Sequence, residues 1–377
     1  MNIESIKAAA ERLRDEVTGP MKASFVGKDE IIDLLSVCVA ARENLFLHGP
    51  PGTAKSALVH SFAGKIQGRT FDYLLSRFTE PNELFGPFDI RKLREGDLVT
   101  NTEGMLPEAD IVFLDELLNA NSAILNSLLM ALNERVFRRG RETRQIPALF
   151  FVGASNHLPE DEALGALFDR FLLRVRCGPV PDEQLGEVLT AGWNLEKAAQ
   201  IESTMQADDL RTFQNAIREV DLEPTREAYI DLVKKLRLAG IEVSDRRAVR
   251  LQRVVAASAL VSGRLEARIS DLWIFRHIWD REEQVEVIES IVSSALQQAE
   301  PQEGDHDQAF KQSAPDPEAL LLGLEQIEAM INAGENGLAA ADELRSLSSR
   351  IEWLPDAPGK IALETKRNEL WEKLEQN

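Results

Sequence analysis

The residues with the clearest chemical pattern lie at positions 49–56, where the chain reads Gly-Pro-Pro-Gly-Thr-Ala-Lys-Ser. An apolar run ends directly before this segment and a helical pattern begins at its end, which is the strand–loop–helix context of a phosphate-binding loop. The backbone amides of such a loop point at phosphate oxygens. Lys55 would then reach the β- and γ-phosphates, and the Ser56 hydroxyl would bind Mg²⁺.

One residue departs from the usual pattern of this loop. Ala54 stands where glycine normally precedes the lysine, and its methyl group restricts the backbone and crowds the phosphate path. If the loop is considered alone, the alternative to a phosphate-binding loop is a proline- and glycine-rich turn that contains a lysine by chance.

Two adjacent carboxylates, Asp115 and Glu116, follow the apolar run at 111–114. Charge beside a core is costly, and a bound Mg²⁺ would account for it. Asp115 would hold the metal, while Glu116 would orient and deprotonate an attacking water. A strand that ends in an acidic surface turn is the alternative.

Asn156 follows the next apolar run, at 148–152, and its amide could also position the water. An asparagine that caps a turn is the plain alternative. Because parallel strands end at one edge of a sheet, this amide and the carboxylates are expected to lie close together.

Two arginines are candidates for stabilising transition-state charge. Arg170 precedes the apolar run at 171–175 and could be presented to the γ-phosphate of a neighbouring subunit. The alternative role for Arg170 is an ion pair with Asp169 on the surface, which would contribute little to stability. Arg246 begins a helical pattern, where its charge opposes the helix dipole, although the adjacent Asp245 offsets this.

The elements that must position these residues alternate between strand and helix patterns in the first 180 residues. Strands are expected at 44–48, 70–75, 111–114, 148–152 and 171–175, with helices at 56–66 and 120–134. Near-continuous apolar strands indicate a parallel sheet covered on both faces. The fold class is therefore α/β, with a parallel sheet flanked by helices.

The rest of the chain is predicted to be helical, with no strand between 182 and 300. Helices are expected to start near Pro224 and Ser244. A polar, proline-punctuated linker is predicted at 301–317, followed by helices at 318–333, ending at Gly334, and at 338–351 and 360–375. The predicted domains are 1–181, 182–300 and 301–377, with Trp353 and Trp371 as packed apolar anchors in the last.

Composition limits the function classes further. The chain has 377 residues and a net charge of −20, which opposes binding to nucleic acid and to anionic membranes. No run is apolar enough to span a membrane and no signal peptide pattern is present. Two cysteines give no disulfide framework, so a cytoplasmic location is expected.

Taken in order, these motifs resemble the MoxR branch of the AAA+ ATPases, and within it the RavA-like subfamily, whose phosphate loop also carries alanine before the lysine. The resemblance spans about residues 24–263. It rests on the segments 26–27, 49–56, 85–87, 111–116, 123–135, 154–160, 169–171 and 244–246.

The resemblance implies an AAA+ P-loop NTPase core, an all-α lid and roles for single residues. Glu116 and Asp115 would form Walker B, Asn156 sensor 1, Arg170 the arginine finger, and Arg246 sensor 2, acting within or between subunits. Inserts at 86–104 and 135–145 would face the pore of a ring. The residues implied to bind ATP or ADP are Val26, Gly27, Pro51, Gly52, Thr53, Ala54, Lys55, Ser56, Ala57 and Asp115, with Ser56 and Asp115 on Mg²⁺.

Three functions stay open from the sequence. The first is a homo-hexameric ATPase that remodels a protein partner, the partner being a separate von Willebrand factor A domain protein or another client. The second is a nucleic-acid motor, which the basic turn at 138–144 would favour and the net charge disfavours. The third is a nucleotide-dependent assembly switch, against which Glu116 argues. The helical C-terminal extension would close the ring or bind an adaptor.

Overall fold

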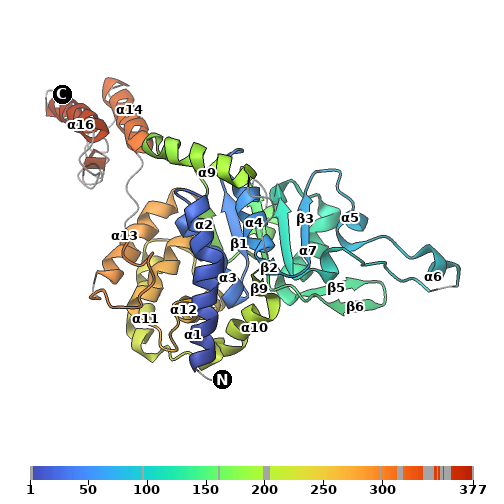
Figure 1. Cartoon of the computed structure of the whole chain (residues 1–377). Coiled ribbons are helices and arrows are strands. Elements are labelled where there is room, and N and C mark those ends of the chain that lie inside the picture. Colours follow the sequence, from blue (N-terminus) through green and yellow to red (C-terminus); the bar gives the residue numbers. More distant parts are fainter. Residues whose placement is uncertain are drawn as a thin grey trace. The chain divides into compact units, whose positions relative to one another are not determined.

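The computed structural model describes residues 3–95, 97–159, 162–197, 204–297, 299–311, 317–333, 344–345, 347–348, 351 and 358–375. The chain forms two compact units, one over residues 1–310 and one over 311–377. The first unit contains every candidate site residue (Figure 1).

A five-stranded sheet lies at the centre of the first unit, in the order β3-β4-β7-β1-β8. All of its strands run parallel, as the apolar runs predict. The strands are β1 (Leu45–His48), β3 (Thr70–Leu74), β4 (Ile111–Asp115), β7 (Phe150–Ser155) and β8 (Leu173–Arg176). Strand β7 begins two residues later than expected, because its pairing with β4 starts at Phe150 opposite Ile111.

Buried helices pack around this sheet. α3 is apolar along nearly its whole length and is buried from Ile31 to Ala41, because it lies between β1, α10 and α12. The helices of the core are α1 (Ile3–Arg12), α2 (Gly19–Ser24), α3 (Asp29–Ala41), α4 (Lys55–Gly64), α7 (Ser122–Glu134) and α8 (Glu162–Phe168), with a π-helical turn at Leu13–Thr18.

The lid region is helical, as predicted, with one exception. The prediction of no strand between 182 and 300 is wrong at β9 (Met205–Gln206), which pairs with β2 (Ile66–Gln67) through two residues only. The helices are α9 (Leu185–Lys197), α10 (Ala207–Ala216), α11 (Arg226–Leu238), α12 (Asp245–Val261) and α13 (Gln284–Leu296), with a 3₁₀ segment at Ile269–His277.

The two predicted inserts contact each other, with the Thr100 amide donating to Glu142 at 2.8 Å. Residues 135–145 form an antiparallel hairpin of β5 (Val136–Arg139) and β6 (Glu142–Gln145). The insert at 86–104 is an arm that is closed by a bridge between Phe88 and Thr100 and carries α6 (Ile90–Arg94) away from the sheet, after α5 (Pro81–Phe85) (Figure 1).

Residues 301–310 are not a linker, contrary to the prediction. Asp305 pairs with Arg268 at 3.0 Å, and the Gln308 amide donates to Asp33 at 2.7 Å. His306 is buried and stacks on Trp273 with ring centroids 4.6 Å apart. This segment therefore belongs to the first unit, because its polar side chains find partners that lie far away in the chain.

The second unit has its own small apolar cluster. It contains α14 (Pro317–Ala333) and α16 (Pro358–Glu375), close to the predicted helices. Trp371 packs against the cluster, as expected. Trp353, Gly334 and most of the helix predicted at 338–351 lie outside the described residues. In the part of the chain that the structure describes, each helix is too short or too polar to cross a bilayer.

Candidate nucleotide site and arginine cluster

The loop at 49–56 follows β1 and enters α4, as its pattern predicts. Gly49 is required by space, because a Cβ there would lie 2.1 Å from the Cys177 carbonyl oxygen. Gly52 and Ala54 both adopt left-handed backbone, with φ of 83° and 67°. Ala54 therefore occupies a conformation that favours glycine, which explains why glycine is usual at this position.

Lys55 is buried and turned into the loop. Its Nζ donates to the carbonyl oxygens of Gly49 at 2.6 Å and Pro50 at 2.9 Å, and the Thr53 hydroxyl also donates to Pro50 at 2.9 Å. A buried ammonium needs acceptors. The loop's own carbonyls supply them here, and phosphate oxygens would be stronger acceptors at the same place.

Ser56 and Asp115 meet at the carboxyl edge of the sheet. The Ser56 hydroxyl donates to Oδ2 of Asp115 at 2.7 Å, although the two residues are 59 positions apart. Hydroxyl and carboxylate oxygens are the ligands that Mg²⁺ prefers, usually together with substrate phosphate and water. The pair therefore has the donor chemistry that fits this ion.

Glu116 has a constrained backbone next to that pair. Its φ of 49° is left-handed, and its amide donates to Oδ1 of Asp115 at 2.9 Å. Asn119 contacts its carboxylate at 3.5 Å. Such strain is found where a side chain must point in a fixed direction, here at the strand end beside the loop.

Asn156 lies just beyond β7, the strand between β4 and β1. Its Oδ1 hydrogen-bonds to Nδ1 of His157 at 2.8 Å, and the preceding Ser155 carbonyl accepts from the Gly49 amide at 3.2 Å. The sheet thus brings Asn156, the carboxylates and the loop to one edge, as predicted.

Arg170 lies at the opposite, amino edge. Its carbonyl accepts from the Asn44 amide at 2.9 Å, and Asn44 directly precedes β1, whose other end enters the loop. Strand β1 has four residues and is therefore about 13 Å long, which separates Asn44 from the start of the phosphate loop.

Within the part of the chain that the structure describes, the side chain of Arg170 lacks a partner for one of its donors. Its Nε is buried with no acceptor among the described residues, and the structure pairs Asp169 with Arg174. Burial, then the charges of Arg246 and Arg250, lower the Arg170 pKa against the opposing effect of Asp169.

Arg246 therefore lies in the electrostatic field of Arg170. It is the second residue of α12, whose N-cap Ser244 accepts from the Arg247 amide at 3.2 Å. The neighbouring Asp245 pairs instead with Arg237 at 2.8 Å. The structure thus brings the two candidate arginines together and keeps them at the edge away from the phosphate loop.

Further arginines at this edge were not predicted. Arg135 is buried over the Phe151 ring and donates to Asn44 at 2.7 Å. Burial, helped by the charge of Arg42, lowers its pKa to about 9, so it stays protonated at neutral pH. Arg250 pairs with Glu43. These side chains are scattered in the sequence and no motif connects them.

Val26 and Gly27 form the turn before α3. Gly27 has a φ of 68°, and a Cβ there would lie 2.9 Å from Val180 and 3.1 Å from Oε1 of Gln184. That Gln184 oxygen is buried and has no hydrogen-bond donor within the described ranges. Gln184 was not predicted as a site residue, because no motif includes it.

The basic turn at 138–144 makes contacts within the chain. Arg139 donates to the Gly86 carbonyl at 2.8 Å and lies over the Phe88 ring. Arg144 donates to the Thr102 hydroxyl at 2.8 Å, and Arg138 pairs with Glu134 at 3.2 Å. These arginines hold the hairpin against the insert and α7.

Comparisons with known proteins agree with the motifs. A family described as the MoxR domain in the MoxR-vWA-beta-propeller ternary systems matches residues 11–215, and an AAA lid domain matches residues 226–292. Two proteins of Methanocaldococcus jannaschii, described as uncharacterized, are 37% and 36% identical to this chain. Those matches cover 75% and 71% of the chain and 73% and 70% of the relatives.

Two further proteins are similar over part of their sequence or in fold. The chaperone MoxR1 of Mycobacterium tuberculosis is 30% identical over 53% of this chain and 55% of that protein. The crystal structure of a candidate ATPase from Cytophaga hutchinsonii has a TM-score of 0.63 at 19% identity, covering 79% of this chain and 97% of its own. The similarity to the Cytophaga hutchinsonii structure shows a shared fold. Membership of the RavA-like subfamily stays a prediction. The α/β core, the helical lid and the family match together place this chain in the MoxR family of AAA+ ATPases.

Proposed function

We propose that this chain hydrolyses ATP in a homo-hexameric ring, at sites completed by the neighbouring subunit. Lys55 and the loop amides bind the phosphates, and Ser56 and Asp115 hold Mg²⁺, which supplies positive charge to the phosphate oxygens. Glu116 takes a proton from the attacking water, which Asn156 helps to orient. The bond to the γ-phosphorus forms as the bond to the β–γ bridging oxygen breaks, which gives ADP and phosphate.

One observation carries the intersubunit part of the proposal. Nε of Arg170 is buried and has no acceptor among the residues that the structure describes, and Arg170 lies beside the like charge of Arg246, at the edge of the sheet away from its own phosphate loop. A buried donor of a cation is costly to leave unpaired until an anion arrives. The γ-phosphate of a neighbouring subunit is that anion, so Arg170 acts in trans, with Arg246 beside it.

At the turn near α3, Val26 and Gly27 contact the nucleotide base in the proposed complex. The free oxygen of Gln184 accepts a hydrogen bond from an amino group of the base, as the amino group of adenine can provide. This contact is compatible with adenine, although guanine also carries an amino group, so the preference for ATP rests on the family.

The work done by hydrolysis is proposed to be chaperone-like remodelling of a protein partner. The matched family's description couples MoxR to a vWA protein, so the partner is a separate protein with a von Willebrand factor A domain. Arg139 and Arg144 of the hairpin donate to groups within the chain, and the net charge of −20 opposes binding to nucleic acid. Such a vWA protein from the same organism should co-elute with the assembled chain, and separate elution would contradict this assignment.

Phosphate release per subunit, measured with Mg²⁺ and ATP across a range of protein concentrations, tests the proposal. Specific activity should rise as the ring assembles. Glu116→Gln should reduce turnover about a hundredfold or more while ATP stays bound. Glu223→Gln, which alters an exposed pair with Arg226, is the matched control and should leave turnover unchanged. Unaltered turnover in Glu116→Gln would remove this residue as the base.

A further inference from the structure

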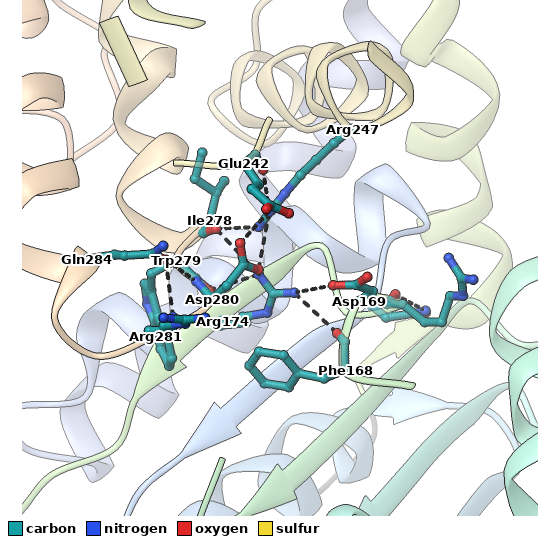
Figure 2. Close-up of polar contacts among 12 residues, drawn as sticks. Phe168, Asp169, Arg174, Glu242, Arg247, Ile278, Trp279, Asp280, Arg281 and Gln284 are labelled. Atoms are coloured by element: carbon teal, nitrogen blue, oxygen red, sulfur yellow. Dashed lines mark hydrogen bonds and ion pairs between the residues drawn. The ribbon is translucent and has the colours of Figure 1, made fainter. Parts of the chain in front are cut away.

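Asp280, in the turn between the 3₁₀ segment and α13, joins two arginines from distant parts of the chain (Figure 2). Oδ1 accepts from Arg174 at 2.6 Å, and Oδ2 accepts from Arg247 at 2.9 Å. The Arg174 side chain is only 1% exposed and that of Arg247 is 14% exposed. One carboxylate therefore pairs with two largely buried cations, which ties the two segments that carry them to the same point.

The first arginine fixes the segment that carries Arg170. Arg174 donates to the Phe168 carbonyl at 3.3 Å, its guanidinium lies 4.2 Å from the centre of the Phe168 ring, and Asp169 lies within 3.8 Å. Figure 2 shows Phe168 and Asp169 on one side of Arg174 and Asp280 on the other. Arg174 thus holds the two residues that directly precede Arg170.

The second arginine fixes the helix start that carries Arg246. Arg247 is the next residue of α12 and donates to the carbonyls of Glu242, at 2.9 Å, and Ile278. Its Nη1 donates to both oxygens of Asp280, at 2.9 and 3.2 Å, while Nη2 donates to Ile278. The planar guanidinium is thus held by the carboxylate and by backbone carbonyls at once, which sets its orientation as well as its distance.

We infer that Asp280 is a positioning residue that sets the spacing between Arg170 and Arg246 for their joint action on the phosphate of a neighbouring subunit. The inference rests on the proposed function. Two like charges held at one edge repel each other, and a third cation at Arg250 adds to this. The Arg174–Asp280–Arg247 bridge, whose arginines lie four residues after Arg170 and one residue after Arg246, opposes that repulsion and keeps both in one geometry.

The same contacts could serve only to attach the lid to the sheet, and the turn has another contact of that type. Glu282 pairs with His48 at 2.7 Å and with Arg176 at 3.5 Å. If the contacts only attach the lid, their loss should lower activity equally in the hydrolysing subunit and in the subunit that donates the arginines. If they position Arg170 and Arg246, their loss should lower activity only in the donating subunit, because only there do the displaced arginines face the phosphate.

A mixture of two inactive subunits separates these roles. Glu116→Gln subunits keep Arg170 but cannot hydrolyse, and Arg170→Ala subunits keep the site but donate no arginine. Mixed rings regain activity only where the first subunit faces the site of the second. Asp280→Asn is then added to the donating subunit or to the hydrolysing subunit, with thermal unfolding of each protein measured in parallel.

In the donating subunit, Asp280→Asn should lower the regained activity about tenfold, and in the hydrolysing subunit less than twofold. Asp245→Asn is the matched control: it makes the same charge change beside Arg246, at a side chain that is 96% exposed, and should have no effect in either place. Equal losses in both placements of Asp280→Asn, or no loss in either, would overturn the inference. No regained activity in the unmodified mixture would contradict the proposed function instead.

Arg247→Lys keeps the inference testable where Asp280→Asn does not fold. It retains the charge and removes the planar group whose two nitrogens contact Asp280 and the Ile278 carbonyl at the same time. The expected loss is about threefold and again confined to the donating subunit, while loss from both placements would assign the bridge to lid attachment.

Discussion

The two edges of the central sheet differ in how far the chain satisfies its own charges. At the carboxyl edge, Lys55 donates to loop carbonyls and Ser56 to Asp115. At the amino edge, Arg170 keeps a buried donor for which the described part of the chain offers no acceptor, beside other cations. In the proposed mechanism, the first edge exchanges internal partners for a ligand, whereas the second is completed by an anion from a neighbouring subunit.

The difference follows from chain connectivity. At the carboxyl edge, Asp115 and Glu116 lie at the end of β4, Asn156 follows β7, and the phosphate loop joins β1 to α4, so elements next to these residues in the chain aim them. The arginines at the amino edge come from a helix end, a hairpin and the lid, and a bridge such as Arg174–Asp280–Arg247 has to hold them in place. If this comparison is right, changes at the two edges should alter different steps.

The largest effect is expected at the carboxyl edge. Lys55→Ala should weaken ATP binding about a hundredfold or more, because a buried charge-assisted contact to phosphate is lost. Binding of a fluorescent ATP analogue measures this, and Lys65→Ala, at the far end of the same helix, is the control. Unchanged affinity in Lys55→Ala would remove the loop from the nucleotide site.

At the amino edge, Arg246→Ala should lower turnover about tenfold without changing ATP affinity of the same subunit by more than about threefold. The reason is that its charge acts on the neighbour's phosphate. Steady-state kinetics and direct binding give the two values. A tenfold loss of affinity with turnover unchanged would place Arg246 over its own nucleotide and break the comparison.

Within the loop, two small residues should respond differently to change. Gly49→Ala should lower the free energy of unfolding by about 2 kcal/mol or more, because the new methyl meets the Cys177 carbonyl and the backbone must shift. Ala54→Gly should change it by less than about 1 kcal/mol, since relief of the left-handed strain offsets the added freedom of the unfolded chain. Urea denaturation measures both, and equal effects would contradict the geometry of the loop.

The smallest effect concerns the segment at 301–310. Burial lowers the pKa of His306, partly opposed by Asp33 and Asp271, so the unfolded chain takes up its proton first as the pH falls. The first unit should therefore lose stability as pH drops below about 6.5, by at most about 1.4 kcal/mol per pH unit from this group.

His306→Gln should reduce that slope of stability against pH. His60→Gln is the control, because His60 forms a half-exposed pair with Asp72. It should change the slope less than His306→Gln does. An unaltered slope in His306→Gln would mean that burial of His306 does not govern it.

Sequence reasoning worked where chemistry is local. The loop at 49–56, the adjacent Asp115 and Glu116, and the apolar strands could all be predicted, because each depends on neighbours in the chain. It failed where partners are distant. Two-residue pairing of β2 with β9 uses backbone groups that leave no pattern, and the polar residues at 301–310 looked solvent-exposed because Asp33 and Arg268 are not adjacent to them. Arg135 and Asp280 carried no motif for the same reason.

The central claim is that a site is shared between subunits, and the most direct test mixes Arg170→Ala protein with unaltered protein at constant total concentration. If Arg170 acts in trans, activity should fall more steeply than the fraction of unaltered subunits, and activity per subunit should rise with concentration in the unaltered protein alone. If activity falls only in proportion to dilution and is flat with concentration, Arg170 does not act on a neighbour, and the intersubunit mechanism is contradicted.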